Sequence, residues 1–418
     1  MHNITGVRGL IARGFRPPNH PGTPPTPTPL FDEDGNPLPR VKENTWRADN
    51  SRDRSHTGYL WKDNASKDQY SGYMFALGVI YDVVADDPTI PQDKKDALID
   101  DARGVGEHLI SNDLRVVDAD GRRTTFGDLC AEEPLGLPIN AFNAVLSLAF
   151  IKIAYHITGD QSFGDYYSNI LVDEKKYPEL VRDLLILNFF QRTNFNNYNM
   201  AFMAIYNLIR LESAPNLKAM YQRALEQRLW TDFTRFKMVK EQKNFFWTMI
   251  YLSQKAVGFD PEDPEDRPAM DKAIESLLLF HPAPLWDREV INSPDYCECW
   301  AIWCPRERRK DCINDRGNRV QALTPLPMDR RPLGSFTANH NPYRLDDGAN
   351  GTLEYSGVGF RLAYWMRQYL FIEGQKQQTF LRPSKDIEDT SAMHEIWVDP
   401  GYAILVEVLE KGEDESEE

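Results

Sequence analysis

Tyr59-Leu-Trp-Lys-Asp-Asn-Ala-Ser-Lys-Asp-Gln-Tyr-Ser-Gly-Tyr-Met-Phe-Ala-Leu-Gly-Val-Ile-Tyr-Asp-Val-Val84 is the stretch that decides the fold. Its second half is apolar almost all the way round a helix, which a surface helix is not. Other helices must therefore enclose it. Its first half is aromatic, polar and acidic and ends where the helix begins. This arrangement is typical of a barrel of helices with a pocket at one end.

Apolar and amphipathic helices alternate along the rest of the chain. The apolar segments are 68–86, 139–158, 196–213, 244–257 and 353–371, and the amphipathic ones are 92–111, 176–190, 215–236 and 265–280. This alternation predicts an inner and an outer ring of helices, an α/α toroid. An α-solenoid also alternates, but it keeps a fixed repeat, whereas the hairpins here vary from about 40 to about 60 residues. We therefore predict an all-α toroid of five or six helical hairpins.

The remaining segments frame the predicted toroid of residues 59–410. Residues 1–58 are proline-rich and predict an extended N-terminal arm. Residues 114–125 predict a small β-hairpin with its turn at Asp120-Gly121. Residues 281–345 form a long capping loop, which is usually functional in a compact domain. Residues 395–409 predict strands or a final packing segment, and the acidic residues 411–418 a disordered tail.

Composition and charge exclude several classes of function. A net charge of −15 over 418 residues and the lack of a basic patch argue against a nucleic-acid partner. The sequence contains no run of about eighteen apolar residues, so no membrane insertion is predicted. The N-terminus lacks the apolar segment of a signal peptide. The motifs H-E-x-x-H, G-x-x-x-x-G-K-[ST], G-x-S-x-G and G-x-G-x-x-G are absent from the sequence. No cofactor is predicted, and the sequence does not identify a protein partner.

The cysteines leave the redox compartment open. Cys297, Cys299, Cys304 and Cys312 follow a C-x-C-x4-C-x7-C spacing, which is not a standard zinc pattern. Paired disulfides, free thiols and a metal knuckle remain alternatives, and we predict no metal site. Disulfides among these four cysteines would favour a secreted or periplasmic protein, and Cys130 would then have no cysteine with which to form a disulfide. A cytoplasmic location stays open.

Polar and aromatic residues gather where the predicted inner helices begin. Parallel inner helices bring their N-termini together, where free N–H groups and helix dipoles favour an anionic or polyhydroxyl ligand. Asn, Ser and Asp are also good N-caps, and Ser66 with Gln69 fits a capping box, so capping is the alternative for each. Capping does not need aromatic residues, whereas sugar rings stack on them. The predicted substrate-binding residues here are Tyr59, Trp61, Gln69, Asn140, Asn197, Tyr198 and Trp247.

Acid and base catalysis needs two carboxylates in different protonation states. Asp63 and Asp68 lie on either side of the first helix start. The loop before the last inner helix returns to the same end and carries Tyr343, Arg344, Asp346, Asp347 and Glu354. Arg54 and His56 add a cation and a titratable group. A solvated loop or a helix cap is the alternative for each acid, and His108 and His156 are expected to have structural roles.

Three stretches together resemble a group of bacterial α/α-toroid proteins that are largely uncharacterised. They are Trp61–Gly72, Ala154–Asp160, and Asn341–Arg344 with Asp347-Gly348, and the resemblance spans residues 55–371. The layout is more distantly similar to toroid glycoside hydrolases and polysaccharide lyases, including unsaturated glucuronyl hydrolases. Those families place acids and aromatics at the mouth of the inner ring. Lanthipeptide cyclases share the toroid but bind zinc through Cys, Cys and His, an arrangement from which the single cysteine-rich loop departs.

These observations predict a carbohydrate-active enzyme that cleaves a poly- or oligosaccharide, with uronic-acid-containing substrates among the candidates. The acids would supply the proton transfers, Arg54 and Arg344 would hold a carboxylate, and Trp61, Tyr198, Trp247 and Tyr343 would stack on sugar rings. Elimination would instead use Tyr343 or His56 as the base. The alternative is a non-catalytic glycan-binding or scaffold protein. At least two acids that converge within about 10 Å of one pocket would favour the enzyme, and aromatics without converging acids would favour binding only.

Overall fold

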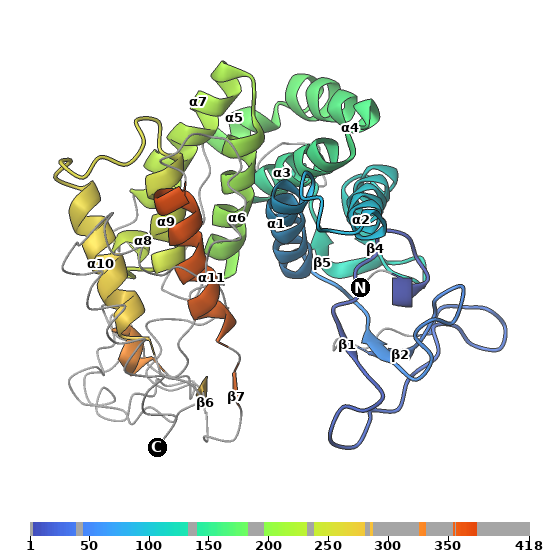
Figure 1. The fold of residues 1–418 in the computed structure, drawn as a ribbon. Coiled ribbons are helices and arrows are strands. Elements are labelled where there is room, and N and C mark those ends of the chain that lie inside the picture. The colour runs from blue at the N-terminus through green and yellow to red at the C-terminus, as the bar shows by residue number, and fades with distance from the viewer. Residues whose placement is uncertain are drawn as a thin grey trace, which may run out of the picture. The chain divides into compact units, whose positions relative to one another are not determined.

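The structure, a computed structural model, describes residues 3–38, 45–132, 140–182, 196–231, 238–280, 285–286, 326–331, 354–355 and 357–373. The protein is mostly helical and carries small antiparallel sheets, as the sequence predicts (Figure 1). The chain divides into two compact units, which we describe separately. The first comprises Met1–Leu187, Asn196–Phe233 and Gln254–Ala256, and the second comprises Asn188–Phe195, Thr234–Ser253 and Val257–Glu418.

The helices of the first unit follow the predicted segments closely. They are α1 (Lys67–Val84), α2 (Gln92–Ser111), α3 (Ala141–Thr158), α4 (Gln161–Asp165), α5 (Tyr177–Arg182), α6 (Asn196–Leu211) and α7 (Pro215–Ala224). Two π-helical segments continue α4 and α7, at Tyr166–Glu174 and Leu225–Trp230. The sequence did not predict a helix over residues 161–174.

Helix α3 is the centre of the first unit and packs against α1, α2, α5 and α6. It is buried along most of its length, and it ends at Gly159, which adopts a left-handed φ of 64° that glycine accepts without strain. Among the described residues only α3 is long and apolar enough to cross a membrane, although the sequence predicted none. Because 72% of α3 is buried inside the structure, the same composition suits a core helix.

The predicted inner helices α1 and α6 also pack against α3 and against each other. Helix α6 is buried from Tyr198 to Ile209. Helix α1 departs from the predicted all-round burial, because Ile80 and Val83 are 46% and 38% exposed. Its buried side faces α3 and α6, so these three helices form the apolar core of the unit.

The N-terminal arm is held to this core by a small sheet. Strands β1 (Gly14–Arg16) and β2 (Trp46–Ala48) pair antiparallel with either side of β3 (Leu60–Lys62), which leads into α1. The hydroxyl of Tyr70 on α1 donates to the carbonyl of Gly9 over 2.9 Å and accepts the N–H of Ile11 over 3.2 Å. The arm is therefore attached to the helical core through both backbone and side chain.

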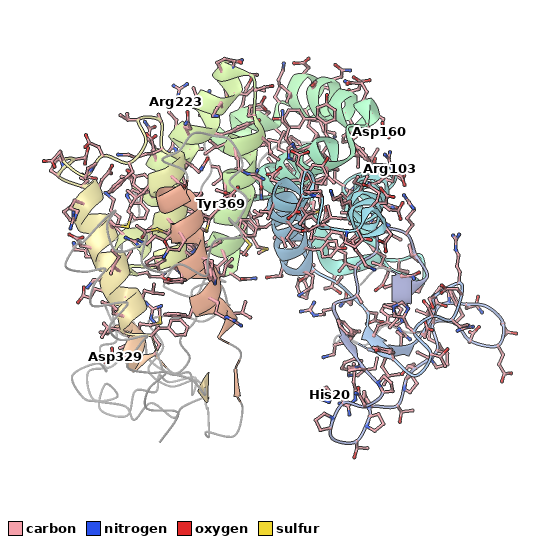
Figure 2. All side chains as sticks on the ribbon, viewed as in Figure 1. His20, Arg103, Asp160, Arg223, Asp329 and Tyr369 are labelled. Carbon is pink, nitrogen blue, oxygen red and sulfur yellow. The ribbon has the colours of Figure 1, made fainter. Side chains whose placement is uncertain are left out.

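The predicted β-hairpin is confirmed. Strands β4 (Arg115–Val117) and β5 (Arg123–Asp128) pair antiparallel, and Gly121 has a φ of 78° in the turn between them. His108 of α2 accepts the N–H of Val117 through Nε2 over 3.1 Å, the structural role expected for this histidine. An ion pair between Arg103 of α2 and Asp160, which caps α4, joins these two helices (Figure 2).

The described part of the second unit contains four α-helices and two short strands, besides a 3₁₀ turn at Met328–Arg330 and a π-helical segment at Gln368–Glu373. The α-helices and strands are α8 (Met238–Glu241), α9 (Phe245–Gln254), α10 (Asp266–Leu278), α11 (Val358–Arg367), β6 (Leu285–Trp286) and β7 (Glu354–Tyr355). Strands β6 and β7 pair antiparallel. Helices α10 and α11 pack together, with the rings of Phe280 and Phe360 5.5 Å apart. The predicted acidic tail, the strands at 395–409 and the four clustered cysteines lie outside the described residues.

A close approach between α2 and its neighbours gives the first testable prediction. A methyl group added at Gly106 would lie 2.5 Å from the ring of Phe163 and 3.0 Å from Cβ of Ala154. We expect Gly106→Ala to lower the free energy of unfolding in urea by about 1–3 kcal/mol, the usual cost of overpacking. In the control Gly72→Ala the methyl group meets no atom within 4 Å, and better helix propensity should raise stability by up to about 1 kcal/mol. Equal stabilities would contradict the close approach.

Candidate functional site

The N-terminal ends of α1, α3 and α6 meet, as the sequence predicts for inner helices. Nζ of Lys67 on α1 donates to Oδ1 of Asn143 on α3 over 2.9 Å. Nδ2 of Asn196 on α6 donates to Oδ1 of Asp68 on α1. Each of these residues lies in the first turn of its own helix. We call Lys67, Asp68, Asn143 and Asn196 the N-terminal cluster.

Lys67 is the cation of the N-terminal cluster. Its ammonium lies 5.5 Å from the centre of the Phe142 ring, at the start of α3. Burial lowers the pKa of Lys67, and the carboxylates of Asp128 and Asp68 oppose that shift. A cation in the first turn of a helix is disfavoured by the helix dipole. This lysine therefore breaks a local rule of helix construction, which real proteins tend to do at functional sites.

Asp68 is the half-buried carboxylate of the N-terminal cluster. Its Oδ2 lies 2.6 Å from the hydroxyl of Ser66, and its Oδ1 accepts from Asn196. Gln69 next to it completes a capping box, since its Oε1 accepts the N–H of Ser66 over 2.8 Å. Asn140 likewise caps α3 by accepting the N–H of Asn143 over 3.0 Å. Capping, the alternative interpretation of Gln69 and Asn140, is thus what the structure shows.

A second polar group adjoins the N-terminal cluster through Asn143, whose Nδ2 donates to the carbonyl of Cys130 over 2.7 Å. The carboxylate of Glu132 there receives three contacts, from Sγ of Cys130 at 2.6 Å, Nζ of Lys175 at 2.7 Å and the hydroxyl of Tyr177 at 2.8 Å. Burial opposes ionisation, but these donors outweigh it and lower the pKa of Glu132 to about 2. Burial, and then the contact with Glu132, raises the pKa of the Cys130 thiol.

The depressed pKa of Glu132 predicts a pH dependence of stability. A carboxylate with a lowered pKa in the folded state stabilises the fold fully above its unfolded value of 4.5 and loses that contribution as the pH falls towards 2. We expect Glu132→Gln to flatten the fall in unfolding free energy over this interval. Glu107→Gln, at an exposed glutamate paired with Arg8, should keep the wild-type slope. If Glu132→Gln showed the wild-type slope of unfolding free energy against pH, the lowered pKa of Glu132 would be contradicted.

Asp63 and Trp61 have structural roles in place of the predicted catalytic and stacking roles. Asp63 is buried, and its Oδ2 accepts from Nε and Nη2 of Arg47 over 2.9 and 2.7 Å. Its Oδ1 accepts the N–H of Thr45 over 2.7 Å. Trp61 is 0% exposed, and its indole N–H donates to the carbonyl of Ala48 over 2.8 Å. Neither side chain is available to a sugar.

The residues predicted upstream lie in one loop of the arm. The rings of His56 and Tyr59 meet edge to face with centres 6.0 Å apart, and Nδ1 of His56 lies 2.8 Å from the Ser55 hydroxyl. Arg54 is exposed and donates to the carbonyl of Asp49 over 2.7 Å. The role of this loop in the site remains a prediction.

The other predicted residues are placed as follows. Asn197 is half-buried in the first turn of α6, beside Asn196, whereas Tyr198 is buried at 2% exposure and packs in the core. Trp247 is buried in α9 of the second unit. Glu354 forms part of β7 through its backbone. Tyr343, Arg344, Asp346 and Asp347 lie outside the described residues, as does most of the 281–345 loop.

Lys67, Phe142, Asn143 and Asn196 belong to this region but are not among the predicted site residues. Lys67 had a signal in the sequence, because a lysine between Ser66 and Asp68 opposes the dipole of the helix it begins. Comparison of the chain with protein-family models, curated proteins and solved structures gives no match. Within the described ranges no group of three or more His, Cys, Asp or Glu residues is placed to hold a metal ion.

Proposed function

We propose that the protein is a carbohydrate-active enzyme on an α/α-toroid scaffold, with the N-terminal cluster as its substrate-binding end. One observation carries the proposal, namely the meeting of the first turns of α1, α3 and α6 through side chains of Lys67, Asp68, Asn143 and Asn196. Amides, an ammonium and a carboxylate at one point form the kind of donor and acceptor set that matches a polyhydroxyl ligand. The ring of Phe142 adds an aromatic face for the apolar side of a sugar.

The proposed chemistry is acid and base catalysis by carboxylates beside Lys67. Asp68 is one of them, and Asp128 is the second carboxylate whose charge acts on the Lys67 ammonium. Cleavage of a glycosidic bond needs one carboxyl group to protonate the leaving oxygen and another to activate water or attack the sugar. Asp68 and Asp128 take these two roles in the proposal, and Lys67 and the two asparagines orient the substrate.

The test is a panel of polysaccharides assayed for new reducing ends and for the absorbance of an unsaturated uronate. Product formation in Asp68→Asn should fall about 100-fold, the usual contribution of an acid–base residue. Asp93→Asn is the matched control, because Asp93 also lies in the first turn of its helix, α2, but is exposed. It should keep wild-type activity. Equal activity in the two variants would contradict the role of Asp68, and thermal unfolding checks that both variants fold.

Glycan binding without cleavage is the second candidate. It is favoured by the burial of Asp63 against Arg47, which removes one of the acids that the sequence placed at this end. For a binding protein, no polysaccharide in the panel should yield a product, but one should bind saturably. Asp68→Asn should weaken this binding, and Asp93→Asn should leave it unchanged. Absence of both products and binding would contradict both candidates.

A further inference from the structure

One segment of the N-terminal arm is restricted by proline at every position. It is Thr23-Pro-Pro-Thr-Pro-Thr-Pro29, in which each residue either is a proline or directly precedes one. Proline fixes φ near −65°, and a residue before proline is pushed out of the helical region towards the β and polyproline II regions. The segment contains neither helix nor strand, although it lies between β1 and β2 in the sequence. Polyproline II, a left-handed helix with three residues per turn, is the conformation that this sequence favours. We call residues 23–29 the proline segment.

Hydrogen bonds hold the proline segment at both ends. Just before it, Nη2 of Arg16 on β1 donates to the carbonyls of Pro21 and Gly22 over 3.1 and 2.6 Å. Near its end, the N–H of Thr28 donates to the carbonyl of Trp46 on β2 over 2.8 Å. A partner would therefore meet a segment whose ends are already fixed, and this lowers the entropy lost on binding.

The prolines between these ends face the solvent to different extents. Pro24 and Pro27 are exposed, whereas Pro25 is half-buried. Three residues per turn place Pro24 and Pro27 on one face of a polyproline II helix and Pro25 a third of a turn away. Proline also lacks the N–H that pairing with a sheet edge needs. Residues 24–27 are thus a P-x-x-P sequence whose two outer prolines share an exposed face.

We propose that residues 23–27 are the docking site for a partner protein with an aromatic-lined, proline-binding groove. Grooves of this kind recognise P-x-x-P segments and exploit a conformation that is already formed and costs little entropy to fix. Asp32, Glu33 and Asp34 are exposed and begin three residues after the end of the proline segment. The matching groove therefore has basic residues beside its aromatic ones. This role of the arm is independent of the glycan chemistry proposed for the N-terminal cluster.

An array of purified SH3, WW and EVH1 modules, probed with the full chain, tests the proposal. The array contains modules with basic residues and modules with acidic residues beside the groove. We expect at least one module of the basic kind to bind. The double variant Pro24→Ala with Pro27→Ala should lower the affinity for that module at least about tenfold, because both prolines fill pockets of the groove.

Two single variants are the matched controls. Pro37→Ala changes an exposed proline of the arm outside the proline segment, and Pro25→Ala changes the half-buried proline within it. Both should bind as tightly as wild type, and thermal unfolding checks that every variant folds. The proposal is overturned if no module distinguishes wild type from the double variant, or if Pro25→Ala loses as much affinity as the double variant. Binding confined to modules of the acidic kind would overturn the proposed partner.

Discussion

Asp82→Ala is expected to lower the free energy of unfolding by about 3–5 kcal/mol, the cost of breaking a buried ion pair by removing one partner. Asp82 is buried in α1, where its Oδ1 lies 2.6 Å from Nε2 of His156 on α3 and its Oδ2 pairs with Arg210 on α6. Arg210 also donates to the carbonyl of Gly78 over 3.1 Å. One carboxylate therefore joins the three core helices near their C-terminal ends.

The control for this prediction is Asp100→Ala. Asp100 also pairs with an arginine, Arg8, at 2.8 Å, but its side chain is 54% exposed. An exposed pair contributes at most about 1 kcal/mol, so urea unfolding should separate the two variants clearly. Similar losses for both would mean that Asp82 does not depend on burial for its effect.

Asp63→Ala is expected to have a comparable effect on stability, about 3–5 kcal/mol, because it leaves the buried guanidinium of Arg47 without its carboxylate. The arm should detach first, since Arg47 lies on β2 and Asp63 directly follows β3. Limited proteolysis within residues 1–58, followed by mass spectrometry, measures that detachment. Arg47 also donates to the carbonyl of Thr28 over 3.0 Å, so the arm is held at more than one point.

A double variant separates this structural role from catalysis. Arg47→Met with Asp63→Leu replaces the pair by apolar side chains of similar volume and should recover most of the stability lost in Asp63→Ala. Under the proposed function, a structural Asp63 also means that the double variant keeps the wild-type level of glycan cleavage or binding. A stable double variant without activity would restore the catalytic assignment of Asp63.

The helices could be predicted from the sequence because buried faces and helix ends have recognisable residue patterns. The apolar run of α3 and the left-handed Gly159 at its end define that helix within two residues. Residues 161–174 escaped prediction for a physical reason. Most of this stretch is π-helical, and its wider turn breaks the 3.6-residue period on which helix recognition depends.

The meeting of the helix ends could be predicted better than the side chains that make it. Asp68, which the sequence placed at the first helix start, contacts Asn196 of α6, and its neighbour Lys67 contacts Asn143 of α3. Trp61 was misassigned because residues 60–62 form a strand, in which successive side chains point to opposite faces. That alternation turns Trp61 into the small core of the arm with Ile4 and Ala12. Asp63 was misassigned because it directly follows this strand, where it pairs with Arg47 of the neighbouring strand. A three-residue strand is too short to show its period in a sequence.

The order of the contacts along the chain has a consequence for synthesis on the ribosome. Strands β1 and β2 have no partner until Leu60–Lys62 emerges, after which the arm sheet can close. The contact between Lys67 and Asn143 becomes possible much later, and the one between Asp68 and Asn196 later still. Chains fold progressively from the N-terminus as they are made. The nascent first unit would therefore complete its N-terminal cluster only after Asn196 has been made, so a chain released before that point would carry a closed arm without this cluster.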